Sequence, residues 1–144
     1  MIRRIDQGEA GTAAELAAML WPGHSRDELE RELADCLSSG RAAVFLLYEE
    51  GEPAGFAQCQ LRFDYVEGAS HSPVGYLEGI FVKEKYRKKC RGRLLLSACQ
   101  SWAEEMGARE FASDCELENE ESLAFHLKSG FEIANRIICF IKKK

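Results

Sequence analysis

The sequence lacks the glycine signatures of the common nucleotide-binding folds. Its 144 residues contain no G-x-G-x-x-G and no G-x-x-x-x-G-K-[ST], which argues against a Rossmann dinucleotide site and a Walker-type triphosphate site. No apolar run approaches the roughly 20 residues of a membrane span, and the stretch from Met1 to Asp6 lacks the apolar core of a signal peptide. We therefore expect a cytoplasmic protein that binds neither of these ligand classes.

Metal-binding and disulfide patterns are also missing. The six cysteines form no C-x-x-C pair and no zinc-type spacing with histidine, so free and mostly buried thiols are expected. The net charge of −5 argues against a nucleic-acid partner, because phosphate binding needs a basic face. An acidic balance suits a cationic substrate better, although net charge alone does not choose one.

Repeats, low-complexity tracts and proline-rich linkers are absent, and the three prolines all fall where loops are expected. With 46% hydrophobic and 30% charged residues, the chain is long enough to build one proper core and too short for two. We therefore expect a single domain over residues 1–144.

Local patterns predict alternating strands and helices. Thr12 and Ser25 each open a capping box, and Gly107 is expected to end a helix whose buried stripe is Leu95, Cys99, Trp102 and Met106. A short helix is expected over Asn119–Ser129. The expected strands are Met1–Ile5, Ala42–Tyr48, Ala54–Phe63, Val74–Val82, Arg109–Asp114 and Phe131–Lys142. This order indicates an α/β fold with a mixed sheet and helices on both of its faces.

A basic turn containing glycine follows the Val74–Val82 strand and precedes an amphipathic helix. Residues 86–94, Tyr-Arg-Lys-Lys-Cys-Arg-Gly-Arg-Leu, gather several backbone N–H groups around one point at a helix N-terminus. Such a point attracts anions through the N–H groups and the helix dipole. The turn therefore predicts a site for a phosphate-bearing cofactor of another kind.

This order of elements, with its basic turn, resembles the GNAT superfamily of acetyl-CoA-dependent N-acetyltransferases. Five segments in matching order resemble the aminoglycoside 6'-N-acetyltransferases in particular: Leu20–His24, Leu61–Gly68, Ser72–Pro73, Leu77–Val82 and Ala112–Asp114. The resemblance implies a GNAT-type fold, with a central mixed, mostly antiparallel, twisted sheet flanked by about four helices. It also implies acetyl-CoA as co-substrate, no metal, a cationic aminoglycoside as partner, and a homodimer, which the apolar run Ile137–Ile141 favours.

The resemblance assigns the pyrophosphate of acetyl-CoA to a turn of the form R/Q-x-x-G-x-G/A. The matching residues are Arg87, Lys88, Lys89, Cys90, Arg91 and Gly92, and Arg93 follows them. Cys90 stands where glycine is usual, so its side chain would obstruct the phosphate or oppose a positive φ, and we expect retained but weakened binding. The pantetheine arm and acetyl group are assigned to the backbone of Ile80, Phe81 and Val82, with Asn119 on the other side. A strand splayed from its neighbour leaves main-chain donors free for such an arm.

Two carboxylates are candidates for the amine side of the reaction. Glu78 lies inside an apolar strand, and could orient the substrate ammonium and take its proton, directly or through water. Asp114 ends the next strand, and open α/β sheets bind ligands outside the carboxyl ends of their strands; the resemblance assigns it to the aminoglycoside. From the residues alone, Glu78 could instead face solvent or pair with an arginine, and Asp114 could be an ordinary N-cap or turn residue. An anionic cleft would also raise the pKa of the amine, which opposes its deprotonation.

The resemblance adds five further residues. Trp21 and Tyr65 match substrate-contacting aromatics, His24 lies in the loop of Trp21, and Asn135 stands where relatives often carry glutamate. His126 stands where many GNAT enzymes have a tyrosine that protonates the departing thiolate, and a histidine could supply that proton. A helix-surface histidine, with the thiolate leaving unprotonated, is the alternative.

Three alternatives to this function stay open at this point. The substrate could be a polyamine or another small cationic amine, and the chain could be a non-catalytic acyl-CoA-binding module, which Cys90 in the cofactor turn makes conceivable. Cys115 beside Asp114 suggests a covalent route, although no histidine partner is positioned in the sequence. Glu78 and Asp114 favour an enzyme, because a sensor of acetyl-CoA needs no amine cleft. We therefore expect direct acetyl transfer to a 6'-amino group in a ternary complex.

Overall fold

The computed structural model describes residues 1–144 and contains one five-stranded sheet. The strands lie in chain order: β1 (Ile2–Arg4), β2 (Ala42–Glu49), β3 (Glu52–Arg62), β4 (Val74–Val82) and β5 (Phe111–Ala112). The first four strands pair antiparallel, and β5 pairs parallel to β4. The expected mixed, mostly antiparallel sheet is confirmed.

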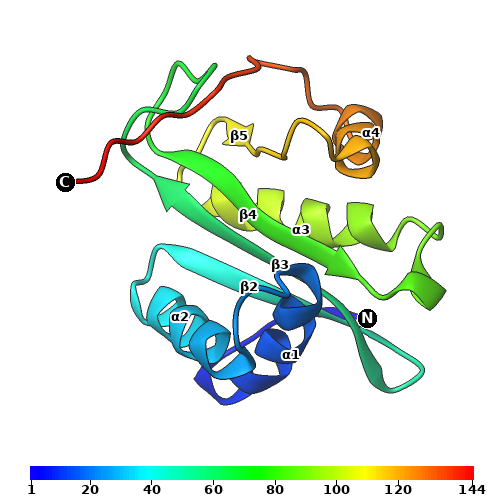
Figure 1. Ribbon diagram of the computed structural model, residues 1–144. Helices are drawn as coiled ribbons and strands as arrows, with labels where there is room; N and C mark the ends of the chain where they lie inside the picture. The colour runs from blue at the N-terminus through cyan, green and yellow to red at the C-terminus, as the bar shows by residue number, and fades with distance from the viewer.

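Three α-helices cover the two faces of this sheet, and a fourth lies at its β5 side (Figure 1). α1 (Ala10–Leu20) and α2 (Arg26–Ser38) pack on one face, α3 (Arg91–Glu105) packs on the other, and α4 (Glu120–Lys128) follows β5. Two short 3-10 turns, Gln7–Glu9 and Glu84–Tyr86, precede α1 and α3. None of the helices is long and apolar enough to cross a membrane.

The sheet separates two apolar cores, because successive side chains of a strand point to opposite faces. Phe45 and Cys59 pack towards α3, whereas Val44 and Phe56 pack towards α1 and α2. The expected stripe of α3 is buried at Leu95, Cys99 and Trp102. The expectation for Met106 is wrong, since this residue follows the last turn of α3 and is 43% exposed.

Capping explains where the helices begin and end. Ser25 caps α2 as expected, and its hydroxyl accepts a hydrogen bond from the Glu28 N–H at 3.1 Å. The expected cap at Thr12 is wrong: α1 begins at Ala10, because a 3-10 turn capped by Asp6 leads directly into it. Gly107, with a φ of +99°, follows the end of α3 as expected.

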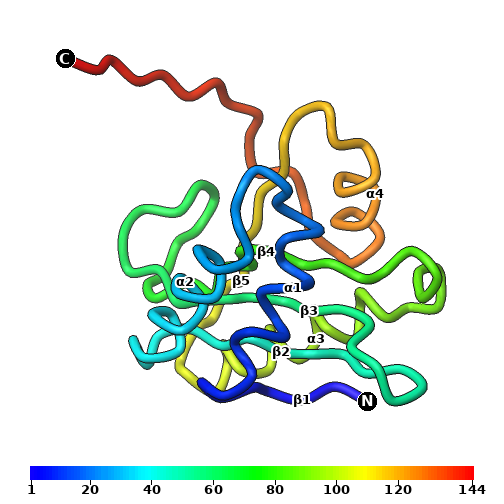
Figure 2. Tube along the Cα trace, turned by 60° about the horizontal axis from the view of Figure 1, so that its bottom comes forward, coloured from blue at the N-terminus to red at the C-terminus, as the bar shows by residue number.

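The expected final strand over Phe131–Lys142 does not form. Residues 131–144 have no strand pairing, and the last residues of the chain extend away from the body of the molecule (Figure 2). A strand needs a neighbouring strand for its backbone hydrogen bonds, and this segment lies beside none of the five strands as a pairing partner. Four apolar side chains near the end of this segment are between 56% and 90% exposed: Ile137, Ile138, Phe140 and Ile141.

A β-bulge interrupts the pairing of β3 and β4 at Glu78. Cys59 pairs with Leu77 and Gln58 pairs with Gly79, so Glu78 is the extra residue on β4. A bulge bends its strand and re-aims a side chain. On the other side, pairing with β5 ends at Tyr76, which leaves the edge of β4 open as far as Val82.

Candidate active site

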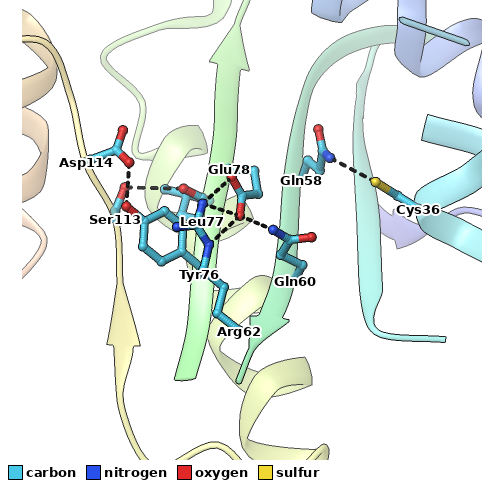
Figure 3. A network of polar contacts seen from close by, with 9 residues as sticks. All are labelled: Cys36, Gln58, Gln60, Arg62, Tyr76, Leu77, Glu78, Ser113 and Asp114. Atoms are coloured by element: carbon cyan, nitrogen blue, oxygen red, sulfur yellow. Dashed lines mark hydrogen bonds and ion pairs between the residues drawn. The ribbon is translucent and has the colours of Figure 1, made fainter. Parts of the chain in front are cut away.

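The bulge brings Glu78 into a polar network (Figure 3). The Arg62 guanidinium donates to both carboxylate oxygens at 2.9 to 3.1 Å, and the Gln60 amide donates to Oε2 at 2.5 Å. Oε2 receives three of these four contacts and Oε1 receives one, so Oε1 keeps an acceptor position. Glu78 is therefore paired with an arginine, as the sequence left open, and has one oxygen available to a further donor.

Asp114 joins the same network through a tyrosine. The Tyr76 hydroxyl donates to the Asp114 carboxylate, and the Arg62 guanidinium lies 3.5 Å from the centre of the Tyr76 ring. Burial, and then the hydrogen bond to Asp114, raise the pKa of Tyr76 well above its usual value. Tyr76 therefore stays a proton donor at neutral pH. Sequence reasoning missed Arg62, Gln60 and Tyr76, although Arg62 stands inside one of the matched segments.

A cavity of about 230 Å³ lies beside Glu78. Its lining consists of Trp21, His24, Leu29, Glu32, Gln58 and Glu78. Three of the residues proposed for substrate binding, Trp21, His24 and Glu78, thus meet at one place. Glu32 on α2 adds a carboxylate that sequence reasoning missed, because an exposed glutamate on a helix gives no signal.

Trp21 is both a wall of this cavity and part of the core. Its indole lies against Gly79, where an added Cβ would come within 2.5 Å of the ring. It also meets Phe56 edge to face, with the ring centroids 6.1 Å apart. Trp21 can therefore contact a substrate in the cavity and also belong to the core.

A larger hollow of about 580 Å³ lies beside the N-terminus. It is lined by Met1, Arg3, Tyr48, Glu49, Glu50 and Gly51, none of which belongs to the predicted site. No three His, Cys, Asp or Glu side chains gather closely enough to hold a metal ion. The candidate site lies around Glu78 and the open edge of β4.

Tyr65 and Asn135 do not line the Glu78 cavity. They meet on the loop between β3 and β4, where the Tyr65 hydroxyl donates to one oxygen of Glu67 and the Asn135 amide donates to the other at 2.8 Å. These hydrogen bonds, that of Tyr65 first, lower the pKa of Glu67. The C-terminal segment crosses the loop at this point, because Ala134 lies directly over Gly68. Within one chain, the structure leaves these two candidates apart from Trp21.

The basic turn after β4 has the backbone of an anion site. Cys90 precedes α3 with a φ of +60°, and Lys88 has a φ of +67°, both in the left-handed region that favours glycine. No side chain caps α3, so the N–H groups of its first turn are free to bind an anion. Gly92 makes room for α4, since a Cβ at this position would come within 2.9 Å of the Phe125 ring. Of the two reasons why a side chain would be unfavourable at Cys90, the positive φ is the one that the backbone shows.

The basic side chains of this turn divide into two groups. The three arginines bond within the protein at 2.6 to 2.7 Å: Arg87 to the Val82 carbonyl, Arg91 to the Glu49 carboxylate and Arg93 to the Lys128 carbonyl. The ammonium groups of Lys88 and Lys89 have no hydrogen-bond or ion-pair partner in the structure. The arginines therefore hold the turn in shape, and the lysines are free to neutralise phosphates.

The open edge of β4 completes the surroundings of a cofactor. Ile80, Phe81 and Val82 pair with β3 on one side only, so alternate backbone groups point towards the other side. Asn119 caps α4, and its side-chain oxygen accepts from the Ser122 N–H at 3.0 Å. An amide-bearing arm fits such an edge as an added strand would. This edge, the uncapped helix and the free lysines together fit coenzyme A.

His126 is half-buried on α4 and is bound at both ring nitrogens. Nδ1 lies 2.7 Å from the Ser122 carbonyl, and Nε2 lies 2.8 Å from the Ser113 hydroxyl. Because a carbonyl only accepts, the neutral ring carries its proton on Nδ1, and Nε2 accepts from Ser113. Sequence reasoning missed Ser113. Cys115 is exposed and bonds to no histidine.

Comparison with known proteins agrees with this geometry. The model of the acetyltransferase (GNAT) family matches residues 12–131. The chain is 41% identical over 140 residues to the aminoglycoside N(6')-acetyltransferase type 1 of Stenotrophomonas maltophilia, which covers 96% of this chain and 90% of that relative. It is 36% identical over 142 residues to the enzyme of the same name from Salmonella typhimurium strain LT2, covering 99% and 98%.

A solved structure agrees over the same length. AAC(6')-Iy in complex with the bisubstrate analogue CoA-S-monomethyl-acetylneamine matches with a TM-score of 0.95 at 35% identity, covering 100% of this chain and 98% of that one. The likeness therefore extends over the sheet, the bulge region and the turn before α3. On both the sequence and the structure, this chain belongs to the acetyltransferase (GNAT) family.

Proposed function

We propose that the protein transfers the acetyl group of acetyl-CoA to the 6'-amino group of an aminoglycoside, by direct attack while both substrates are bound. The observation that carries this proposal is the gathering of Trp21, His24 and Glu78 around one cavity, beside a strand edge and a turn that fit coenzyme A. Two relatives that match nearly the whole chain are named for this activity. The related AAC(6')-Iy binds an analogue that joins CoA to acetylneamine.

The cavity suits one ring of a cationic amino sugar. Its volume of about 230 Å³ is below the roughly 300–1,000 Å³ of pockets that enclose drug-sized ligands, so the rest of a multi-ring substrate would lie outside. The flat indole of Trp21 can pack on a sugar ring. Oε1 of Glu78 can accept from an ammonium group, with Glu32 and Asp114 adding negative charge around it. Glu78, already bonded to Arg62 and Gln60, acts in this proposal as an orienting charge.

We also propose that residues 1–144 act as one domain in the cytoplasm. Both apolar cores are built on the same sheet, so neither half has a core of its own. All six cysteines are free thiols, which suits a reducing compartment. Limited proteolysis that splits the chain into two stable fragments would contradict the first statement, and recovery of the protein outside the cytoplasm on cell fractionation would contradict the second.

We propose further that the protein is a homodimer joined through residues 131–144. Ile137, Ile138, Phe140 and Ile141 expose apolar side chains beside a backbone without strand partners. Such a segment buries its side chains by pairing with the sheet of a second copy, and a twofold axis makes the exchange mutual. Light scattering should give a dimer for the wild type and for the control Lys143→Glu, and a monomer for Phe140→Glu. A monomeric wild type would contradict the proposal.

Turnover by the purified protein tests the main proposal. Acetyl-CoA is mixed with aminoglycosides that carry a 6'-amino group, with counterparts that carry a 6'-hydroxyl, and with polyamines, and free CoA is followed with a thiol reagent. We expect release only with the 6'-amines, and NMR of the product should locate the acetyl group on the 6' nitrogen. Release with polyamines alone would assign another substrate class. Binding of acetyl-CoA without turnover of any amine would indicate an acyl-CoA-binding module.

The Cys115→Ala variant separates the two routes of transfer. Direct attack needs no nucleophilic cysteine, and Cys115 is exposed without a histidine partner. We therefore expect turnover close to that of the wild type. Complete loss of turnover in a folded variant would indicate a covalent acetyl-cysteine route instead.

A further inference from the structure

We propose that the hydroxyl group of Ser113, rather than the ring of His126, exchanges protons with the reacting atoms of the acetyl transfer. Ser113 would act as a relay, and His126 would act through it. The inference rests on the proposed function and names a catalytic residue that sequence reasoning missed.

Ser113 lies where β4 and β5 separate. Tyr76 and Ala112 are the last paired residues, and just beyond them the Ser113 hydroxyl lies 3.5 Å from the Leu77 carbonyl (Figure 3). From this point the edge of β4 is open towards Val82, where the acetyl-bearing arm fits. Asp114 follows immediately and is bonded to Tyr76 on the amine side. Ser113 therefore stands between the cofactor edge and the carboxylates.

His126 has no ring nitrogen left for a substrate. Nδ1 is bound to the Ser122 carbonyl at 2.7 Å, with the Ser122 hydroxyl 3.4 Å away, and Nε2 is bound to Ser113 at 2.8 Å. No charged side chain bonds to either nitrogen. A carbonyl cannot give or take a proton in this range of pH, and the Ser122 hydroxyl is 0.6 Å farther from the ring than the Ser113 hydroxyl, at 3.4 Å against 2.8 Å. The shortest route for a proton into or out of the ring therefore passes through the Ser113 hydroxyl.

The surroundings of His126 fix this arrangement. The rings of Phe125 and Phe131 flank the imidazole, with centroids 5.7 and 5.0 Å away. A hydroxyl next to a histidine, whose other nitrogen is oriented by a third group, is the general arrangement by which enzymes move protons at a reacting centre. Here the orienting group is a backbone carbonyl on the same helix as the histidine.

The proton transfers balance without any other reactant. When a neutral amine attacks the acetyl carbon, its nitrogen becomes positively charged and must lose one proton. This proton passes to the Ser113 oxygen while the proton of Ser113 passes to Nε2 of His126, which leaves both ring nitrogens protonated. As the carbon–sulfur bond breaks with its electron pair on sulfur, Nε2 returns its proton to Ser113 and Ser113 gives one to the thiolate. One proton has moved from nitrogen to sulfur, and both side chains are unchanged.

The first test needs no amine. The imidazole of His126 is observed by ¹⁵N NMR at one fixed pH in the wild type and in Ser113→Ala, each with and without free CoA, and calorimetry confirms that both proteins bind CoA. We expect CoA binding to change the Nε2 resonance in the wild type, because the hydroxyl that bonds to Nε2 then also contacts the thiol, and to leave this resonance nearly unchanged in Ser113→Ala. An equal change in both proteins would overturn the relay, because the effect of CoA would then reach His126 without Ser113.

The second test uses turnover. We expect kcat of Ser113→Ala to fall by about 10²-fold with both KM values unchanged, as for loss of a general acid–base group. Ser113→Thr, which keeps a hydroxyl, should restore most of the rate. His126→Gln keeps a hydrogen-bond acceptor for Ser113 but does not titrate, and should lose as much as Ser113→Ala.

The double variant of these two residues distinguishes a relay from two separate roles. Residues that act as a unit have non-additive effects, so the double variant should be no slower than either single variant. Multiplied losses, or an unchanged kcat in Ser113→Ala, would overturn the proposal. If the wild type acetylates no amine at all, the proposed function fails, and the NMR comparison of the Nε2 resonance alone decides whether Ser113 links CoA to His126.

Discussion

Arg62 binds both carboxylate oxygens of Glu78 at 2.9 to 3.1 Å, so this carboxylate of the cavity lining already has a cationic partner. An incoming ammonium group must share Glu78 with this guanidinium. Arg62 also lies over the ring of Tyr76, which bonds to Asp114, and so connects the two carboxylates of the site. The charge available to a substrate is therefore smaller than the carboxylates alone would provide.

Replacing Arg62 tests this competition. In Arg62→Gln, Glu78 would face the amine without a competing cation, and KM for a polycationic substrate should fall about tenfold, as a charge-assisted contact of about 1.5 kcal/mol would give. We expect kcat to fall as well, because Glu78 loses its fixed position. Steady-state kinetics at low and high salt measure both effects, and salt should reduce the change in KM.

A matched control for Arg62 is Arg41→Gln, since Arg41 also lies over an aromatic ring, that of Phe63, but does not bond to Glu78. Its KM should equal that of the wild type. A KM that rises in Arg62→Gln would mean that Arg62 supports substrate binding and does not compete with it.

Gly79→Ala should displace Trp21 from the cavity. The added Cβ would come within 2.5 Å of the indole, and a rigid ring that is also packed on Phe56 has little room to move. We expect a loss of about 1–3 kcal/mol in the free energy of unfolding, as overpacked cores show, and a higher KM for the amine. Denaturation curves and kinetics measure the two. Gly23→Ala, in the same loop as Trp21 and with nothing within 4 Å of the new Cβ, is the control.

Cys90→Gly should relieve the turn that precedes α3. A side chain in the left-handed region costs about 1–2 kcal/mol, and the entropy of glycine offsets about 0.5–1 kcal/mol of this. We therefore expect a slightly more stable protein that binds acetyl-CoA a few times more tightly. Lys88→Gly relieves a similar φ of +67° but removes a free lysine, so it should gain stability and lose affinity. Unchanged affinity in Cys90→Gly, measured by calorimetry, would mean that cysteine carries no penalty there.

The pH dependence of stability should reflect Glu52. The Tyr86 hydroxyl donates to Glu52 at 2.6 Å and Lys85 pairs with it at 2.9 Å. These contacts, that of Tyr86 first, lower the pKa of Glu52 from 4.5 to about 2. Since the pKa is lower in the folded protein than in the unfolded chain, the contacts stabilise the fold above about pH 4.5, and this contribution disappears as the pH falls towards 2.

Melting temperatures measured across this range check the expectation for Glu52. The difference between the wild type and Glu52→Gln should be largest above about pH 5 and should shrink on acidification. Glu50→Gln, in the neighbouring turn and without a bonded partner, should show no such trend. A difference that grows at low pH would contradict the assignment.

The bounds of an element could be predicted where they depend on neighbouring residues in the sequence. The bounds of β4 are those expected, because Val74–Val82 is an apolar run between turn residues, and Ser25 marks the start of α2 by a hydrogen bond to its own helix. Residues 131–142 have an equally strand-like pattern and yet form no strand. Their pattern describes one side of a pairing, and no strand of the sheet pairs with them.

The features of the candidate site are also of two kinds, those that depend on adjacent residues and those that depend on distant ones. The positive φ of Cys90 could be predicted, because it depends on a turn of adjacent residues. The contacts of Glu78 with Arg62 and of Asp114 with Tyr76 join residues 16 and 38 positions apart, and they depend on the register of the sheet. The sequence indicates that a carboxylate is there, but not what it bonds to. Ser113 and His126 are likewise brought together by packing of α4.

Because of the bulge at Glu78, the number of residues in β4 decides which face of the sheet each side chain takes. Leu77 and Val82 are separated by an odd number of positions and still lie in the same core, while Phe81 and the Trp21 contact at Gly79 lie on the opposite face. An uninterrupted strand would put Leu77 and Val82 on opposite faces. Deleting one residue at the bulge would turn the side chains of half the strand from one face of the sheet to the other. Related sequences should therefore tolerate substitutions in this strand more readily than insertions or deletions.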